Sequence, residues 1–319
     1  MPSEFDLIRR HFDRAPRHSD LAVGDDAALL SVSAGMQLAV TTDMLVAGTH
    51  FFADTDADDL GWKTLAVSVS DLAAMGARPR WAVLALALPA ADEAWIAAFA
   101  NGLFACARAH DIDLVGGDTT RGPLNLTLTL FGEVPRGSAI RRDGAGDGDD
   151  LWISGSPGFA ALGLAALQGR TELNDAGRAR ALAALQRPQP RLDLGVALRG
   201  LATAMLDVSD GLLGDLGHIL ERSGCGAIVD VGALPMQALI DAGASPELAR
   251  DCLLGGGDDY ELLFTAPARA RTRLLGLAAE LELPLHRIGS LCASGNGLRL
   301  REHNGMLAGG ARSGYDHFR

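Results

Sequence analysis

Aspartates next to glycine, threonine or serine recur along this sequence of 319 residues, and they are the side chains best suited to chemistry. Any one of them, taken alone, is better explained as a cap or turn residue, because Asp and Ser bond nearby backbone N–H groups. Together they offer the carboxylate and hydroxyl oxygens that magnesium prefers. The six segments are Gly24-Asp25-Asp26-Ala27, Thr41-Thr42-Asp43, Ser70-Asp71-Leu72, Gly116-Gly117-Asp118-Thr119-Thr120, Leu206-Asp207-Val208-Ser209-Asp210-Gly211 and Gly256-Gly257-Asp258-Asp259-Tyr260.

Four of these aspartates lie at positions where binding of a cation is a better explanation than capping. Asp43 ends an apolar run that predicts a strand, and Asp71 lies within an apolar helical run. A carboxylate in such surroundings is costly unless it is paired or bound to a cation. Asp207 and Asp210 are three residues apart across a strand-to-helix turn, so both can point into one crevice at the carboxyl end of a strand. The pattern predicts a cluster of magnesium ions that neutralises phosphate groups.

Charge and missing motifs narrow the class of protein. A net charge of −12 argues against a nucleic-acid partner, and it favours divalent cations as the link to an anionic nucleotide. The only lysine, Lys63, follows Trp62 without a glycine run, which excludes a P-loop, and the protein-kinase motifs are absent. The Gly155–Gly158 loop precedes a predicted helix, and it can either lie near phosphate or be an ordinary turn.

The elements that must position these residues alternate between helices and short strands, which predicts an α/β protein. No C-x-x-C pair is present, and the longest apolar stretches are far shorter than the ~20 residues that span a membrane, so we expect a cytoplasmic protein with reduced cysteines. The polar stretch Pro135–Asp150 predicts a boundary between an N-terminal domain, 1–137, and a C-terminal domain, 138–319. Expected strands are 36–42, 81–88, 112–115, 125–134, 151–154, 204–208, 226–231 and about 260–265, and expected helices are 59–75, 92–110, 159–168 and 211–223.

The order and spacing of the six segments resemble the thiamine-monophosphate kinases, within the superfamily typified by aminoimidazole ribonucleotide synthetase. Gly61-Trp62-Lys63, Asp259-Tyr260-Glu261-Leu262 and the closing Gly314-Tyr315-Asp316-His317-Phe318 extend the resemblance almost end to end. It implies two α/β domains, with the first domains of two subunits joined in a shared β-barrel, and hence a homodimer. It also implies ATP bound between the domains with several Mg²⁺ ions, and transfer of the γ-phosphoryl group to thiamine monophosphate in thiamine diphosphate biosynthesis.

The same resemblance assigns roles to individual residues. No side-chain base is required, because a phosphate monoester is largely dianionic at neutral pH and can itself attack. The implied metal ligands are Asp26, Thr41, Thr42, Asp43, Asp71, Asp118, Asp207 and Asp210. ATP contacts are Gly117, Asp118, Arg142 and Ser209, and contacts to the thiamine phosphate are His50, Asp258 and Phe318.

The sequence departs from the family pattern at one position, and two alternative functions stay open. The family usually reads Gly-Gly-Glu-Asp-Tyr-Glu-Leu, whereas this chain has Asp258 in place of the first Glu, which shortens the reach of the carboxylate by one methylene. Another ATP-using enzyme of the superfamily is the nearest alternative, although no cysteine precedes Cys106 or follows Cys292, as selenide-activating or hydrogenase-maturation relatives would require. A non-catalytic protein that binds divalent cations is the other.

Overall fold

The computed structural model describes residues 4–293, 297–302 and 304–309. The chain divides into two compact units, which we describe separately. Unit 1 comprises Met1–Leu72 and Ala77–Gly137, and unit 2 comprises Ala73–Gly76 and Ser138–Arg319. In the part of the chain that the structure describes, no helix is long and apolar enough to cross a membrane.

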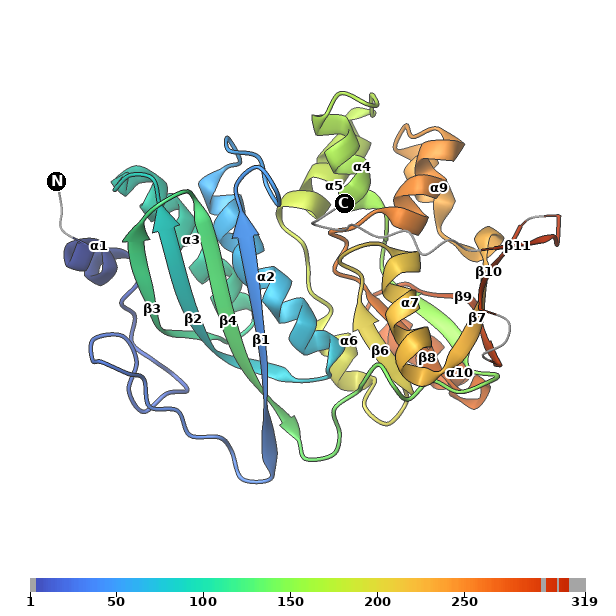
Figure 1. Cartoon of the computed structure of the whole chain (residues 1–319), viewed down its shortest axis with the longest axis horizontal. Coiled ribbons are helices and arrows are strands. Elements are labelled where there is room, and N and C mark those ends of the chain that lie inside the picture. The colour runs from blue at the N-terminus through green and yellow to red at the C-terminus, as the bar shows by residue number, and fades with distance from the viewer. Residues whose placement is uncertain (1–3, 294–296, 303, 310–319) are drawn as a thin grey trace. The chain divides into compact units, whose positions relative to one another are not determined.

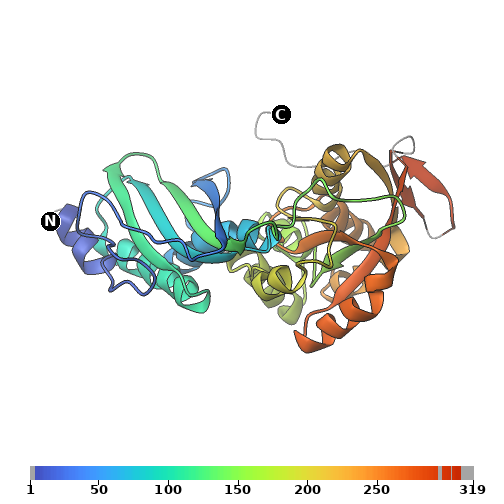
Figure 2. The same ribbon diagram turned by 90° about the horizontal axis from the view of Figure 1, so that it is seen from below.

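Unit 1 is a four-stranded sheet with two long helices along one face (Figures 1 and 2). Its strand order is β1-β4-β2-β3, in which β2 and β3 are parallel and the other neighbours antiparallel. The elements are α1 (Glu4–His11), β1 (Met36–Val46), α2 (Ala57–Ala74), β2 (Arg78–Leu88), α3 (Glu93–Ala109), β3 (Asp113–Arg121) and β4 (Asn125–Pro135).

Two glycines let α2 and α3 approach backbone to backbone. A Cβ atom at Gly61 would lie 2.0 Å from the carbonyl oxygen of Phe99, and one at Gly102 would lie 1.7 Å from that of Asp58. On the strand side, Leu126, Leu128 and Leu130 of β4 are fully buried, as the alternation of a half-buried strand requires. These contacts fix α2 against the sheet, so that polar side chains on its inner face meet those of β1.

Unit 2 is built on a seven-stranded mixed sheet with the order β11-β10-β7-β9-β5-β8-β6. Its core packs strand residues such as Leu206 and Leu263 against Leu216 and Ile219 of α7. The strands are β5 (Asp150–Ser154), β6 (Ala204–Asp207), β7 (Cys225–Asp230), β8 (Leu262–Ala266), β9 (Leu285–Ala293), β10 (Leu298–Arg301) and β11 (Leu307–Gly309). The α-helices are α4 (Phe159–Leu167), α5 (Asp175–Gln186), α6 (Leu192–Ala197), α7 (Leu212–Ser223), α8 (Met236–Asp241), α9 (Pro246–Gly255) and α10 (Arg271–Glu280).

The structure corrects the sequence reading at two strand ends. Asp43 lies inside β1, which continues to Val46, and not at the end of the strand. The strand expected at 112–115 runs on through the Gly116-Gly117 pair to Arg121. Glycine lowers strand propensity, but here the absent side chain allows β3 to pair closely with β2. Both aspartate segments are therefore parts of strands, whose alternation decides where each side chain points.

Candidate functional site

A pair of carboxylates lies between β1 and α2. Asp43 accepts a hydrogen bond of 2.6 Å from the Ser68 hydroxyl, and Asp71 accepts one from the Thr41 hydroxyl. Thr41 and Asp43 are two apart on the strand and therefore share its inner face, while Ser68 and Asp71 are three apart on the helix and share one side. Sequence positions 30 residues apart thus supply one cluster of oxygen atoms.

This cluster carries more negative charge than its surroundings favour. Burial and, to a smaller extent, the nearby charge of Asp71 raise the pKa of Asp43 from its usual 3.8 to about 6, and the Ser68 hydrogen bond opposes both effects. A cation beside the two carboxylates would relieve the repulsion. All the side-chain donors are oxygens, the type that suits Mg²⁺, which usually takes one or two carboxylates and completes its shell with water or phosphate.

Thr42 lies on the other face of the same strand. Its hydroxyl is 2.9 Å from that of Thr129, the residue opposite it on β4. The side chain of Thr42 therefore does not join the Asp43–Asp71 cluster. Period-two alternation is the reason, since neighbouring strand residues point to opposite faces.

A second group of predicted residues lines one cavity of about 310 Å³ in unit 1. Residues 24–27 and 116–119 bring Asp26 and Asp118 to it, while apolar side chains such as Phe12 and Leu114 supply much of the remaining wall. Asp26 and Asp118 are both exposed. The cavity thus combines carboxylates and a glycine-rich backbone with an apolar lining.

Gly117 occupies a position that no larger residue fits. It pairs with Leu84 on the parallel strand β2, and a Cβ atom at position 117 would lie 1.9 Å from the carbonyl oxygen of Leu84. The backbone of Gly116–Thr119 is therefore held directly against β2, where it forms part of the cavity wall.

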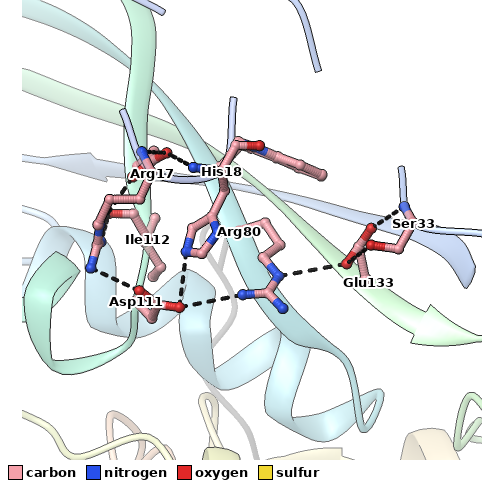
Figure 3. Close-up of polar contacts among 9 residues, drawn as sticks. Arg17, His18, Ser33, Arg80, Asp111, Ile112 and Glu133 are labelled. Atoms are coloured by element: carbon pink, nitrogen blue, oxygen red, sulfur yellow. Dashed lines mark hydrogen bonds and ion pairs between the residues drawn. The ribbon is translucent and has the colours of Figure 1, made fainter. Parts of the chain in front are cut away.

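The segment that carries Asp26 has little regular structure and is tied to the sheet by polar contacts on both sides. The buried carboxylate of Asp113 accepts the backbone N–H groups of Arg17 and His18 at 2.7 and 2.6 Å. Asp111, which follows α3, pairs with the Arg17 guanidinium at 2.7 Å and with the His18 ring at 2.9 Å (Figure 3). These contacts hold the start of the segment.

Further along, the buried carboxylate of Glu133 accepts the Ser33 N–H at 2.6 Å (Figure 3). Arg80 links the two ends of the network, because its guanidinium lies 3.3 Å from Asp111 and 3.5 Å from Glu133. The loop with Asp26 is thus anchored at both ends to β2, β3 and β4. Sequence reasoning did not single out these residues, since each is an ordinary charged residue until the fold brings them together.

In unit 2, the Asp207–Gly211 loop connects β6 to α7. Asp207 is buried at the end of the strand, and Ser209 and Asp210 are half-buried. Asp215, in the first turns of α7, accepts the N–H groups of Ser209, Asp210 and Gly211 through one carboxylate oxygen at 3.0, 3.0 and 3.2 Å. Sequence reasoning missed Asp215; the only signal was an acidic residue near the start of a helix.

The Asp215 carboxylate is itself buried, with 4% of its surface exposed. Burial, together with the charge of Asp210, raises its pKa from the usual 3.8 to about 6, although hydrogen bonds from the loop N–H groups and the charge of His218 act in the opposite direction. An ionised group here is tolerated because three N–H dipoles converge on it.

The loop that carries Asp258 lies directly on the Asp207–Gly211 loop. Asp258 N–H donates to the Ser209 carbonyl and Tyr260 N–H to the Val208 carbonyl, both at 2.8 Å. Asp258 and Tyr260 have positive φ angles of 65° and 51°, an unusual conformation for residues other than glycine. The Tyr260 hydroxyl donates to the Asp258 carboxylate at 2.9 Å, which restrains the residue that replaces the family's usual Glu.

The Gly155–Gly158 loop is a βα turn whose backbone is bonded by side chains of the protein. Asp259 accepts the Gly158 N–H at 2.7 Å, at the start of α4, and buried Glu261 accepts the Ser156 N–H at 2.9 Å. Arg191 in turn pairs with both oxygens of Glu261 at 2.7 and 2.6 Å. The structure therefore favours the ordinary turn over a phosphate loop, because carboxylates already occupy these N–H groups.

The remaining predicted contacts are dispersed. The His50 ring accepts the Val46 N–H through Nδ1 at 3.0 Å, in the turn that follows β1. Arg142 is exposed, and its carbonyl accepts the Ser223 hydroxyl at 2.8 Å. Phe318 lies outside the described residues. Among residues 4–293, 297–302 and 304–309, no group of three or more His, Cys, Asp or Glu side chains is placed to hold a metal ion.

Comparison with known proteins identifies both halves of the chain. The AIR synthase related N-terminal domain matches residues 24–134, and the corresponding C-terminal domain matches residues 146–300. Thiamine-monophosphate kinase of Salmonella typhimurium is 47% identical over 324 residues, which cover 99% of this chain and 98% of the relative. The enzyme of the same name from Escherichia coli K12 is 46% identical over 320 residues, with the same coverage.

Solved structures agree with the sequence relatives. The crystal structure of thiamine-monophosphate kinase from Stenotrophomonas maltophilia has a TM-score of 0.84 and 52% identity, and covers 91% of this chain and 92% of its own. AaThiL complexed with AMPPCP and TMP has a TM-score of 0.77 and 29% identity, and the match covers 93% of this chain and 92% of that structure's chain. Hydrogenase maturation protein HypE of E. coli, at 21% identity and a TM-score of 0.72 over 96% of this chain and 94% of its own, shares the fold.

Proposed function

The chain belongs to the thiamine-monophosphate kinase family, and on that premise we propose that it transfers the γ-phosphoryl group of ATP to thiamine monophosphate. The products are thiamine diphosphate and ADP. Similarity along nearly the whole chain to relatives of this one named activity carries the proposal. The relative solved with an ATP analogue and TMP supports the same pair of reactants.

The reaction is a direct in-line displacement. A terminal oxygen of the acceptor phosphate forms a bond to the γ-phosphorus as the bond to the bridging oxygen of ATP breaks, and ADP leaves. The acceptor is already largely dianionic at neutral pH, so no side chain has to remove a proton. The chain's own task is to align the two phosphates and to offset their mutual repulsion.

We assign the cation-binding role to oxygen donors in both units. Bound Mg²⁺ would supply positive charge between the phosphates. The raised pKa of Asp43 beside Asp71 supports a cation at that pair. The full set that we propose, with several Mg²⁺ ions, is Asp26, Thr41, Asp43, Asp71, Asp118, Asp207 and Asp210. Thr42, which the family resemblance also implies, is left out of this set because its side chain faces Thr129 on the other side of β1.

Nucleotide and acceptor contacts remain proposals of the same kind. For ATP they are Gly117, Asp118, Arg142 and Ser209, and for the acceptor His50, Asp258 and Phe318. Residues 1–137 would then carry most of the ATP and Mg²⁺ contacts, and residues 138–319 would complete the site. ATP as the donor accords with the cytoplasmic location expected from the sequence.

An exposed apolar strip supports a homodimer joined through unit 1. Leu38, Val40 and Met44 alternate along the outer face of β1, with 43%, 55% and 54% of their surfaces exposed. β1 is also an edge strand, with β4 on one side. Apolar edge strands tend to pair with another chain. We propose that β1 contributes to the shared β-barrel that the family resemblance implies.

The test of function is a product assay. Purified protein is incubated with ATP, Mg²⁺ and thiamine monophosphate, and we expect thiamine diphosphate and ADP in equal amounts. Parallel samples omit the acceptor or contain EDTA. A folded protein that forms no thiamine diphosphate would exclude the proposal, and ADP formed without that product would instead indicate another ATP-using enzyme of the superfamily.

A further inference from the structure

Asp215 holds the loop between β6 and α7 in a way that helix capping does not explain. A side chain that caps a helix accepts N–H groups of its first turn. Asp215 lies inside α7 and reaches back to the N–H groups of Ser209, Asp210 and Gly211, which precede the helix. We call these three N–H groups the amide cradle.

An amide cradle of this kind is normally an anion site. Successive backbone N–H groups that converge at the start of a helix bind phosphate in many proteins, because their dipoles add. Here one oxygen of a buried carboxylate occupies all three. The loop thus has the geometry of a phosphate site, but the protein's own anion fills it.

Most other backbone groups of the loop are also taken. Val208 N–H donates to the Glu261 carbonyl, and the Val208 and Ser209 carbonyls accept from Tyr260 and Asp258, all at 2.8 Å. The Gly211 carbonyl accepts Asp215 N–H at 2.9 Å within the helix. The side chains of Asp207, Ser209 and Asp210 are then the groups through which we expect the loop to meet a ligand.

We propose that Asp215 is a positioning residue for the nucleotide site: by filling the amide cradle, it restricts the loop to binding metal–nucleotide through its side chains. The inference rests on the proposed function for the identity of the nucleotide. It assigns no contact between Asp215 and substrate. Its consequence is that the loop discriminates against phosphate that arrives without a cation.

The test uses Asp215→Asn, which keeps the size of the side chain and removes its charge. Asp149→Asn is the matched control, since Asp149 is also buried and accepts Gly146 N–H at 3.0 Å and the Thr203 hydroxyl at 2.7 Å. Asp149 directly precedes β5. Its partner Thr203 directly precedes β6, whereas Asp207 is the last residue of β6, so the two lie at opposite ends of that strand. Both variants lose charge-assisted hydrogen bonds, but only one borders the loop.

The measured quantity is the affinity for Mn²⁺, followed by its electron paramagnetic resonance signal, with the protein saturated by AMPPCP. For Asp215→Asn we expect affinity at least about tenfold weaker, and for Asp149→Asn affinity within about twofold of the unchanged chain. Melting temperature is recorded for both, so that loss of fold is recognised. Steady-state kinetics should show a higher KM for Mg²⁺–ATP in Asp215→Asn, with an unchanged KM in the control.

The proposal would be overturned if Asp215→Asn bound Mn²⁺ with the affinity of the unchanged chain, or if the Asp149→Asn control lost as much affinity as Asp215→Asn. If Asp215→Asn does not fold, Asp215→Glu, which restores the charge, replaces it. A folded Asp215→Glu variant whose affinity for Mn²⁺ is at most about one-tenth of that of the unchanged chain would then overturn the proposal. Thiamine monophosphate is absent from the binding measurement. A chain that bound Mn²⁺ and AMPPCP but made no thiamine diphosphate would therefore refute the proposed function and leave this inference standing.

Discussion

Replacing Asp43 by Asn separates the requirement for activity from the requirement for stability. Burial of Asp43, with a smaller contribution from the nearby charge of Asp71, raises its pKa to about 6. In the metal-free protein the ionised carboxylate therefore destabilises the folded state. The asparagine keeps an oxygen that can accept the Ser68 hydroxyl, and it removes the charge.

The magnitude follows from the difference between 3.8 and about 6. At about 1.4 kcal/mol for each pH unit, the ionised group costs the folded state roughly 3 kcal/mol once the pH is well above 6. Because the folded pKa is raised, this cost is absent below pH 3.8, grows as the pH rises from 3.8 to about 6, and is constant above that range. Asp43→Asn should therefore raise the free energy of unfolding by about 2–3 kcal/mol at pH 8 and leave it nearly unchanged at pH 3.5.

The assay is urea unfolding in EDTA at both pH values, combined with the product assay in Mg²⁺. We expect Asp43→Asn to be folded and more stable at pH 8, while turnover falls by on the order of 10²–10³ or more, as for loss of one strong transition-state contact. Asp54→Asn, which changes an exposed carboxylate, should alter neither quantity. Near-normal turnover would refute the cation assignment, and a less stable variant at pH 8 would refute the electrostatic reasoning.

Three further predictions test other parts of the molecule. Gly117→Ala should reduce turnover at least about tenfold and lower the melting temperature, because the new methyl would lie 1.9 Å from the Leu84 carbonyl oxygen; unchanged kinetics would contradict this close approach. Val40→Glu should shift the protein from dimer to monomer in sedimentation at micromolar concentration, and an unaltered dimer would place the interface elsewhere. Asp150→Asn should lower the free energy of unfolding at pH 7 but not at pH 2. Hydrogen bonds from Arg271 hold the pKa of Asp150 below its usual value, so the stability that the ionised carboxylate contributes is present above the usual pKa and is lost on acidification. Equal effects of the substitution at both pH values would exclude the ion pair as the cause.

Much of the fold could be predicted from the sequence because local pattern determines it. Segments such as Ala57–Ala74 and Asn125–Pro135 carry the periodicity of a buried helix and a half-buried strand, and the structure confirms both. Strand ends were less predictable. β3 runs through Gly116-Gly117 because the parallel partner β2 accepts a backbone without side chains, and only tertiary pairing reveals such a partner.

The sequence by itself determined the family, since similarity to thiamine-monophosphate kinases covers 99% of the chain, and it supplied the oxygen donors on which the proposed cation-mediated phosphoryl transfer rests. It also named Asp43 and Asp71, which the structure brings together. Only the tertiary structure decided which donors share a face. Alternation along β1 turns Thr42 away toward Thr129, and a buried helix residue, Asp215, fills the amide cradle. Spacing along a chain sets which types of atom are present, but the direction of each side chain depends on packing between elements distant in sequence.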